Sequence, residues 1–327
     1  MKKIILVVCC AALLIGCKNE KKDKTSRPVM AMAKSVGKIN EVSVVIDPRL
    51  WKGNIGDTIR KYLAAEVPGL PQEEPLFSLR QMPEKTFTGF ATKNRTFLKV
   101  HKGSTKGFQV LENKYANPQI GFVVTGETDE EIASVLRKNA AKIITRFKNI
   151  ELAEKQSRIK KSLEKIPQLE EKMGITMDIP SAYRIAIEEE DFFWVRKDIE
   201  HGSMNIMIYE VPLQTIQKDS NTIGSIIKMR DSVGSKKIPT DSGNFITEEA
   251  YAPYLYQITI DDRFTYETKG TWEIKDRFMA GPFVNYAIED KKNNRYVVVE
   301  GFVFAPSTYK RDNMFELEAI IETLSFK

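Results

Sequence analysis

The stretch FVNYAIEDKKNNRYVVVEGFVF, residues 283–304, decides the fold class. Its two apolar runs, 283–288 and 295–304, are rich in β-branched and aromatic residues and are separated by a short polar break that contains KKNN. Parallel strands would need a crossover of about a dozen residues or more, usually a helix, between the two runs. The stretch therefore predicts a β-hairpin and, with it, an antiparallel sheet.

The same pattern extends on the N-terminal side of this hairpin. Strand candidates separated by short polar breaks lie at 175–179, 183–187, 192–196, 204–211, 254–260, 264–268 and 272–274. Apolar stripes predict helices at 223–233 and 313–324. We therefore expect a C-terminal antiparallel α+β lobe over residues 174–327, with its helices packed on one face of the sheet.

The N-terminal half carries strands and helices of its own. EVSVVI at 41–46 predicts a strand, and apolar residues at helical spacing from Trp51 to Leu63 predict a short helix behind it. Further strand candidates lie at 75–80, 95–100, 107–111 and 119–125. Thr128 and Glu131 form a capping-box pattern in front of an aliphatic stripe, which predicts a helix. We expect a second α+β lobe over residues 39–150.

A highly charged segment, residues 151–173, lies between the two lobes. A narrow apolar stripe runs through it, with Pro167 near its end, and fewer than three heptads are sustained. We interpret it as a charged helical connector, with a partner-binding coiled coil as the alternative. The expected fold is therefore α+β, with two lobes of mainly antiparallel sheets, helices on one face, and a long charged helix joining the lobes. Both halves end with an apolar strand and a helix, which leaves a duplication open.

The start of the chain has the features of an export signal. Lys2 and Lys3 precede an apolar run, Ile4 to Ile15, that is far shorter than the roughly 20 residues needed to span a bilayer as a helix. LIGC at 14–17 resembles the bacterial lipobox, in which the cysteine is acylated after cleavage. We expect residues 1–16 to be a lipoprotein signal peptide, cleaved between Gly16 and Cys17, and 17–38 to be a lipidated flexible tether. An ordinary secretory signal with an incidental cysteine is the alternative.

Acylation of Cys17 would fix the mature chain to a membrane. A diacylglycerol plus an N-acyl chain such as palmitate binds a bilayer far more firmly than one chain does. The expected partner is therefore membrane lipid. The expected location is the cell envelope, at the outer membrane, with the body facing the periplasm or the cell surface. Cys9 and Cys10 leave with the signal, so the mature body has no thiol for a disulfide, a thiolate metal site or a nucleophile.

The charge of the chain is concentrated near its start. The total is +6, of which residues 1–16 contribute +2 and residues 18–38 contribute +5, so residues 39–327 carry −1. Proteins that bind nucleic acids usually carry a basic excess on the folded domain. We therefore expect no nucleic-acid partner. The basic tether could favour anionic lipid headgroups or serve only as a soluble spacer.

Few residues point to catalysis or to a cofactor. The two histidines, His101 and His201, have no second ligand at metal-binding spacing, and no nucleophile elbow, phosphate loop or dinucleotide fingerprint occurs. We expect no metal and no cofactor. The carboxylate runs 188–191 and 261–262 lie between strand candidates and are expected to be turns. Their alternative role is as the acid and base of a glycan hydrolase.

Aromatic and basic residues near the end of the chain are the candidate ligand-facing residues. They are Trp272, Arg277, Tyr286, Tyr309 and Arg311. A wall of such rings beside two arginines could receive a sugar or a peptide. The alternative is that the rings bury area between sheet and helix.

Four segments carry a resemblance to a known family. They are GTWEIKDRFMAGPFVNY (270–286), EGFVFAPSTYKRDNMFELEAIIETL (300–324), WKGNIGDTIRKYL (51–63) and PGLPQEEPLF (68–77). The chain resembles, from about Glu41 to Lys327, an uncharacterised family of Bacteroidota lipoproteins defined by a domain of unknown function, family 4837. The resemblance implies an envelope lipoprotein of Gram-negative cells and carries over no activity or catalytic residue. Surface-displayed lipoproteins of that phylum often have an acidic run after the cysteine, and KNEKK at 18–22 lacks one.

We therefore expect a noncatalytic envelope lipoprotein that acts as a binding or assembly factor, with an envelope protein or glycan as its partner. A carboxylate-based hydrolase of envelope glycans is the alternative.

Overall fold

The computed structural model describes residues 32–275 and 277–327, and residues 34–327 form one compact unit. The expected signal peptide, Gly16 and Cys17 lie outside the described residues, as does the tether up to residue 31. In the described part of the chain, no helix is long and apolar enough to cross a membrane.

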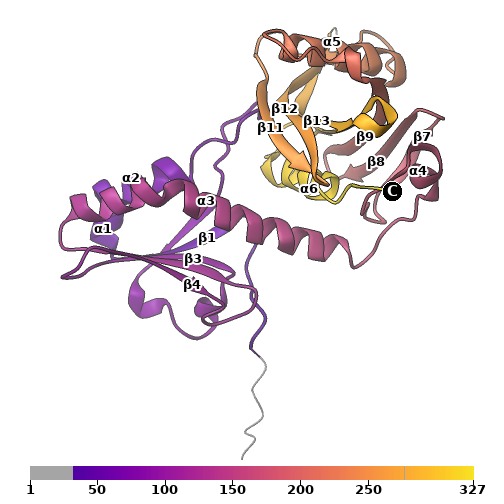
Figure 1. Ribbon diagram of the computed structural model, residues 1–327. Coiled ribbons are helices and arrows are strands. Elements are labelled where there is room, and N and C mark those ends of the chain that lie inside the picture. Colours follow the sequence, from indigo (N-terminus) through magenta and orange to yellow (C-terminus); the bar gives the residue numbers. More distant parts are fainter. Residues whose placement is uncertain (1–31, 276) are drawn as a thin grey trace, which may run out of the picture. The chain divides into compact units, whose positions relative to one another are not determined.

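The N-terminal lobe contains a five-stranded sheet and three α-helices (Figure 1). Its strands are β1 (Glu41–Ile46), β2 (Ser78–Met82), β3 (Thr96–Lys102), β4 (Gly107–Glu112) and β5 (Ile120–Gly126). Its helices are α1 (Pro48–Lys52), α2 (Asn54–Leu63) and α3 (Asp129–Ile159), with the 3₁₀ turns η1 (Glu84–Thr86) and η2 (Gly89–Lys93). The strand order is β2-β1-β3-β5-β4.

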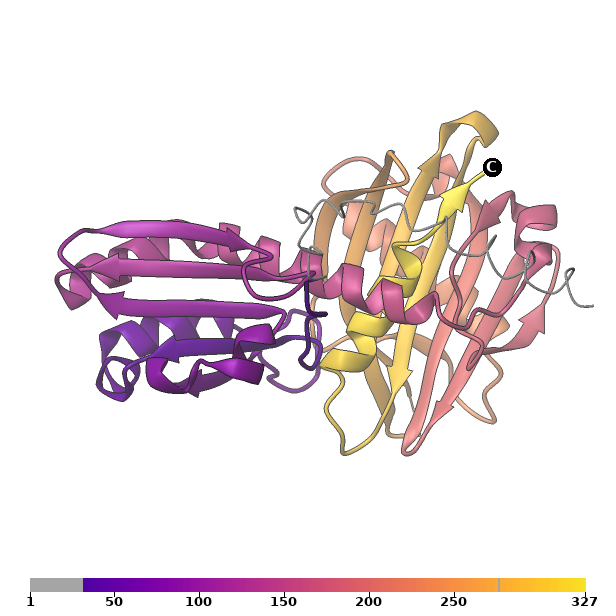
Figure 2. The same cartoon turned by 90° about the horizontal axis from the view of Figure 1, so that it is seen from below.

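The sheet of this lobe is mostly parallel, although the described sheets taken together are mainly antiparallel, as expected. β1 pairs in parallel with β2 and β3, β3 pairs in parallel with β5, and only β4 and β5 are antiparallel. β3 and β4 are consecutive in the chain, yet β5 lies between them. Figure 2 shows these strands side by side. The central strands are buried on both faces, which explains continuous apolar runs such as EVSVVI.

Two helices cover one face of this sheet, and the 3₁₀ segment covers the other. Ile59 of α2 and Phe147 of α3 pack with Leu98 of β3 in one apolar cluster. On the opposite face, Phe87 packs on Phe97, with ring centroids 5.1 Å apart. Both faces of the three central strands are therefore closed to water.

The helix α3 begins as the sequence predicts. Thr128 and Glu131 form a capping box, which satisfies backbone N–H groups at the first turn. The helix continues past the sheet to Ile159, which packs in the core of the C-terminal lobe. Within the expected connector 151–173, the helix therefore breaks after residue 159. A second helix, α4 (Pro167–Met173), has Pro167 in its first turn, where proline is tolerated, and ends at Gly174 with φ 65°.

The C-terminal lobe is built on one eight-stranded sheet, β10-β12-β13-β14-β9-β8-β7, with β11 also paired to β12. Its strands are β7 (Arg184–Glu188), β8 (Phe192–Ile199), β9 (Gly202–Pro212), β10 (Phe245–Thr247), β11 (Tyr254–Ile260), β12 (Arg263–Ile274), β13 (Met279–Asp290) and β14 (Arg295–Phe304). The remaining elements are β6 (Ile175–Thr176), β15 (Ser325–Phe326), the helices α5 (Thr222–Lys237) and α6 (Arg311–Ile321), and the 3₁₀ turns η3 (Leu213–Thr215) and η4 (Lys291–Asn293).

The pairing confirms the predicted hairpin. β13 and β14 pair antiparallel from Phe283↔Phe302 to Asp290↔Arg295, around the break at 291–294. All other pairs in this sheet are antiparallel too. The α+β class with two lobes is confirmed. The candidates 264–268 and 272–274 are parts of a single long strand, β12.

The two helices of this lobe lie on opposite faces of the sheet, not on one face (Figure 1). Leu317 and Ile320 of α6 pack on the face that carries Val299, whereas Ile226 of α5 packs on the face that carries Val298. β13 and β14 are buried on both faces along most of their length, because one helix packs on each face and excludes water from it.

Polar contacts join the two lobes in addition to α3. The buried carboxylate of Glu74 accepts hydrogen bonds from the backbone N–H groups of Lys310 (2.7 Å) and Arg311 (2.9 Å) at the start of α6. Lys155 of α3 donates to Glu316 of α6 at 2.7 Å. A carboxylate at a helix N-terminus is favoured by the exposed N–H groups and by the helix dipole.

Candidate functional site

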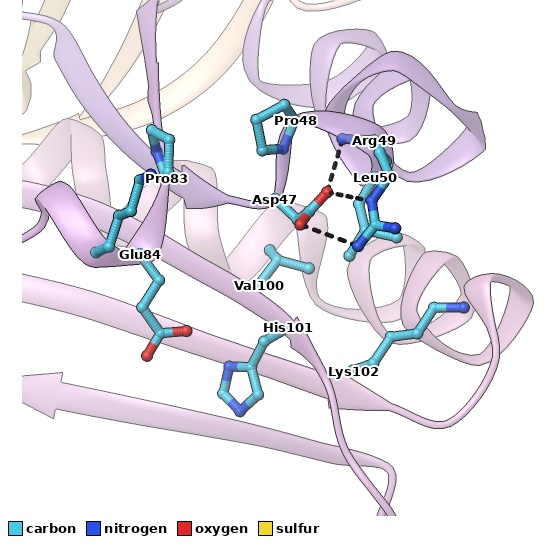
Figure 3. A pocket seen from close by; sticks show the side chains of 10 residues that line it. Asp47, Pro48, Arg49, Leu50, Pro83, Glu84, Val100, His101 and Lys102 are labelled. Atoms are coloured by element: carbon cyan, nitrogen blue, oxygen red, sulfur yellow. Dashed lines mark hydrogen bonds and ion pairs between the residues drawn. The ribbon is translucent and has the colours of Figure 1, made fainter.

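A pocket of about 850 Å³ lies at the carboxyl ends of the parallel strands β1, β2 and β3 (Figure 3). It is lined by Asp47, Pro48, Arg49, Leu50, Pro83, Glu84, Lys85, Val100, His101 and Lys102. Its volume falls within the range of about 300–1,000 Å³ that is usual for small-molecule sites.

The topology of the sheet explains why a pocket forms here. The chain leaves β1 toward β2 on one side, whereas it leaves β3 toward β5 on the other side. Open sheets of this kind form a crevice outside the carboxyl ends of the two strands where the order reverses. Residues 47–50 follow β1, and residues 100–102 end β3, so the pocket lies at that switch point.

Asp47 is the first acid of the pocket. Its carboxylate caps α1 by accepting the backbone N–H of Arg49 at 2.8 Å, and it also accepts Nε of the Arg49 side chain at 3.2 Å (Figure 3). The side-chain hydrogen bond from Arg49 holds the pKa of Asp47 below its ordinary value. Pro48, in the first turn of α1, suits a helix start because its φ is already helical.

Glu84 is the second acid, on the strand-end loop after β2. Nζ of Lys99 donates to its carboxylate at 2.6 Å, and this hydrogen bond lowers the pKa of Glu84. Both carboxylates are therefore ionised at neutral pH. Glycoside hydrolysis needs one carboxyl group that keeps its proton until the leaving group departs. Neither Asp47 nor Glu84 is suited to that role.

The remaining polar groups of the pocket are basic. Lys102 pairs with Asp129 of α3 at 2.8 Å. Among the described residues, no ion-pair partner is found for Lys85, and Nδ1 of His101 is buried without a hydrogen bond. None of the described lining residues carries a hydroxyl or a thiol. Among the described lining residues, the pocket therefore offers an unpaired ammonium to a ligand but no hydroxyl or thiol nucleophile.

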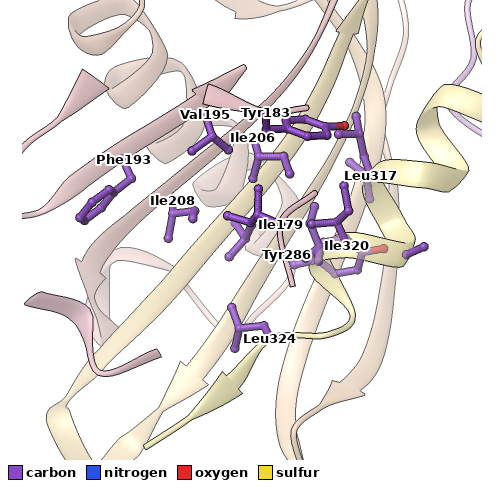
Figure 4. Close-up of a cluster of buried hydrophobic side chains, with 14 of the residues drawn as sticks. Ile179, Tyr183, Phe193, Val195, Ile206, Ile208, Tyr286, Leu317, Ile320 and Leu324 are labelled. Carbon is purple, nitrogen blue, oxygen red and sulfur yellow. The ribbon is translucent and has the colours of Figure 1, made fainter. Parts of the chain in front are cut away.

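Two of the predicted ligand-facing aromatics are core residues. Trp272 is 2% exposed, stacks on Phe245 with centroids 5.0 Å apart, and donates its indole N–H to the Val303 carbonyl at 3.2 Å. Tyr286 is fully buried beneath α6 (Figure 4) and donates to Glu267 at 3.0 Å. The two rings lie on opposite faces of the sheet, so they do not form one wall.

The other three predicted residues lie apart from those rings. Arg277 is in an exposed turn, where it contacts Asp241 at 3.1 Å. Arg311 donates to the Pro75 carbonyl at 2.9 Å and so holds the lobes together. Of the three predicted aromatics, only Tyr309 is open to solvent, with 79% of its surface exposed. The structure therefore does not bring these five predicted residues into one site.

The carboxylate runs occupy turns, as expected. Glu189–Asp191 joins β7 to β8, and Asp261 and Asp262, with φ of 47° and 57°, form the two-residue turn between β11 and β12. In residues 32–275 and 277–327, no cluster of three or more His, Cys, Asp or Glu could hold a metal ion.

A separate charged cluster lies where α6 meets β12. Nζ of Lys269 contacts Glu318 at 2.7 Å and Glu267 at 3.2 Å. Burial lowers the pKa of Lys269, but the charges of Glu318 and Glu267 outweigh it and raise that pKa overall. Burial and repulsion from Glu318 and Glu267 raise the pKa of Glu322 to about 7. These residues do not line the pocket at β1–β3.

The sequence did not predict that the residues of this pocket lie together. Asp47 caps α1, Pro48 lies in the first turn of that helix, and His101 lies near the end of β3. Only the parallel order of β1, β2 and β3 brings residues 47–50, 83–85 and 100–102 together. The continuous apolar strands were the one available signal for that parallel order.

Two family models match the chain, one in each half. Residues 162–323 match the model described as Domain of unknown function (DUF4837). The C-terminal half of the chain therefore belongs to the DUF4837 family. Residues 35–160 match a second model, Domain of unknown function (DUF8532), so the DUF4837 match is shorter than the expected 41–327. A search of curated proteins found no relative of this chain. The pocket lies wholly within the DUF8532 part.

The two matches also bear on the organisation of the chain. They meet at residues 160–162, directly after α3. The two halves match different models, and one sheet is mostly parallel whereas the other is antiparallel. Neither observation supports a duplication.

Proposed function

We propose that this chain, with its DUF8532 and DUF4837 domains, is a noncatalytic, lipid-anchored binding protein of the cell envelope. Its N-terminal pocket receives a small polar ligand, and acylated Cys17 fixes it to a membrane. The observation that carries the proposal is the pocket at the switch point between β1 and β3. The lipobox-like sequence at 14–17 supports the anchor.

The side chains of the pocket favour binding over hydrolysis. Arg49 and Lys99 already engage the two carboxylates, and both carboxyl pKa values are lowered. A general acid would need a raised pKa, and a covalent mechanism would need a nucleophile. Neither lining carboxyl has a raised pKa, and the described lining residues include no hydroxyl or thiol nucleophile.

The same side chains suggest the chemistry of the ligand. Lys85 brings a positive charge without a charged partner, and His101 brings a ring nitrogen without a hydrogen bond. A carboxylate or phosphate group would pair with the Lys85 ammonium beside the His101 ring. The preferred ligand is therefore a small molecule that carries at least one anionic group.

Saturation-transfer NMR of the detergent-solubilised chain tests this proposal. The probes are succinate, citrate, glucose 6-phosphate and N-acetylmuramic acid, with soluble peptidoglycan fragments followed in parallel for product release. We expect saturable binding of at least one anion and no turnover. Lys85→Ala should weaken binding, whereas Lys114→Ala, an exposed lysine outside the pocket, should not.

Absence of binding across the panel, or equal effects of the two variants, would contradict the binding role. Release of a product from the peptidoglycan fragments would contradict the noncatalytic role.

A further inference from the structure

A second cavity, of about 470 Å³, lies elsewhere in the structure. It forms where the loop 66–73 meets Tyr251, Tyr254 and the backbone of β12 at Gly270. None of its lining residues lines the pocket at β1–β3.

The loop that forms one wall is held in place before any ligand binds. Pro68 and Pro71 restrict its backbone, and the N–H of Val67 donates to the Glu74 carbonyl at 2.9 Å. Gly69 has φ +82°, and a Cβ there would lie 3.0 Å from atoms of Lys269 and Gly270. The glycine therefore lets the loop rest directly on β12.

Two tyrosines on the other wall are open to solvent. Tyr251 is 67% exposed and Tyr254 is 51% exposed, whereas Tyr266 of the same sheet is only 5% exposed. The structure thus presents two aromatic rings at a cavity instead of packing them into the core. Such rings bind either the flat face of a sugar or a cation.

The charges of the cavity distinguish these two ligands. Glu66 and Glu73 line it, and in the described part of the chain neither carboxylate has a hydrogen bond or an ion pair. None of the described lining residues is a lysine or an arginine. The ammonium of Lys310 contacts the lining residue Gln72 at 3.2 Å and the Thr308 carbonyl at 2.7 Å. Both carboxylates are therefore available to pair with a cationic group of a ligand.

We propose that this cavity binds a lysine or arginine side chain of a basic peptide segment. The ammonium or guanidinium group lies over Tyr251 or Tyr254 and pairs with Glu66 and Glu73. Two aromatic faces and two free carboxylates complement such a group in shape and in charge. The site is separate from the small-ligand pocket and does not depend on it.

Isothermal titration of the full chain in detergent with acetyl-trilysine amide tests the proposal. We expect saturable binding that weakens as salt is raised, because exposed charges are screened. Glu66→Gln combined with Glu73→Gln should weaken binding about three- to tenfold. Tyr254→Ala should weaken it about two- to fivefold.

The matched control is Glu171→Gln combined with Glu190→Gln, two exposed glutamates outside the cavity that change the net charge equally. Circular dichroism checks that every variant folds. Equal weakening by the control pair would overturn the proposal, because the peptide would then respond only to net charge. Absence of trilysine binding, or its displacement by triacetylchitotriose at similar concentration, would overturn it as well.

Discussion

Replacement of Arg95 by methionine should destabilise the N-terminal lobe strongly and in a pH-dependent way. Arg95 and Glu151 are both about 1% exposed. Nε and Nη2 of Arg95 donate to the Glu151 carboxylate at 3.0 and 2.8 Å, and the backbone N–H of Asn40 donates at 3.2 Å. Nη2 also donates to the Lys38 carbonyl at 3.0 Å. The pair therefore ties the segment before β1, the start of β3 and the helix α3 together.

Arg95→Met leaves Glu151 buried with a single backbone donor. Breaking a buried ion pair from one side costs about 3–5 kcal/mol, a large part of a total stability of about 5–15 kcal/mol. Burial already raises the pKa of Glu151, against the hydrogen bonds and charge of Arg95, which lower it. A raised pKa means that stability is lost as the pH rises through it. The variant should therefore lose less stability at pH 5 than at pH 8.

Urea unfolding followed by circular dichroism at the two pH values measures this loss. Arg95→Met combined with Glu151→Leu should recover much of it, because no buried charge is left without a partner. Arg80→Met, at an exposed arginine on β2, is the matched control and should change stability by less than about 0.5 kcal/mol. The reasoning is refuted if the single variant loses less than about 1 kcal/mol at pH 8, or if the double variant is no better.

Three further predictions concern the charged cluster, the lobe junction and the anchor. Glu322→Gln should stabilise the chain at pH 8 by up to about 1 kcal/mol and have almost no effect at pH 4. The reason is that a carboxyl with a pKa of about 7 opposes folding only once it ionises. Equal urea midpoints of the variant and the parent chain at pH 8 would contradict this. Glu74→Gln should cost about 0.5–2 kcal/mol by weakening the cap of α6, and an unchanged thermal midpoint would argue against that cap. Cys17→Ala should move the chain from the detergent phase to the aqueous phase in Triton X-114 partition, and continued membrane association would contradict the anchor.

Local patterns in the sequence predict much of this fold. The hairpin at 283–304 follows from a break too short for a crossover, and the start of α3 follows from the capping box at Thr128. Both depend on residues that are close in the chain. The pairing of β3 with β5, past the intervening β4, depends on contacts between distant residues, so the parallel order was not predicted.

The same difference explains the outcome for the candidate sites. Trp272 and Tyr286 were grouped because they are close in sequence. Tyr286 pairs across the strands with Glu267, and Trp272 lies five residues further along β12, so the two rings point to opposite faces. The residues of the pocket at β1–β3 show the reverse relation. Its three segments are far apart in the chain and come together only through the sheet topology.

Imidazole NMR of the full chain tests the central claim most directly, because the chain has only two histidines. His101 lines the pocket, and His201 lies in the exposed turn between β8 and β9 and serves as an internal control. The account predicts that a bound anion such as citrate shifts the His101 resonances saturably, leaves those of His201 in place, and loses this effect in Lys85→Ala. Absence of a shift at His101 across the anion panel, or equal shifts at both histidines, would contradict it.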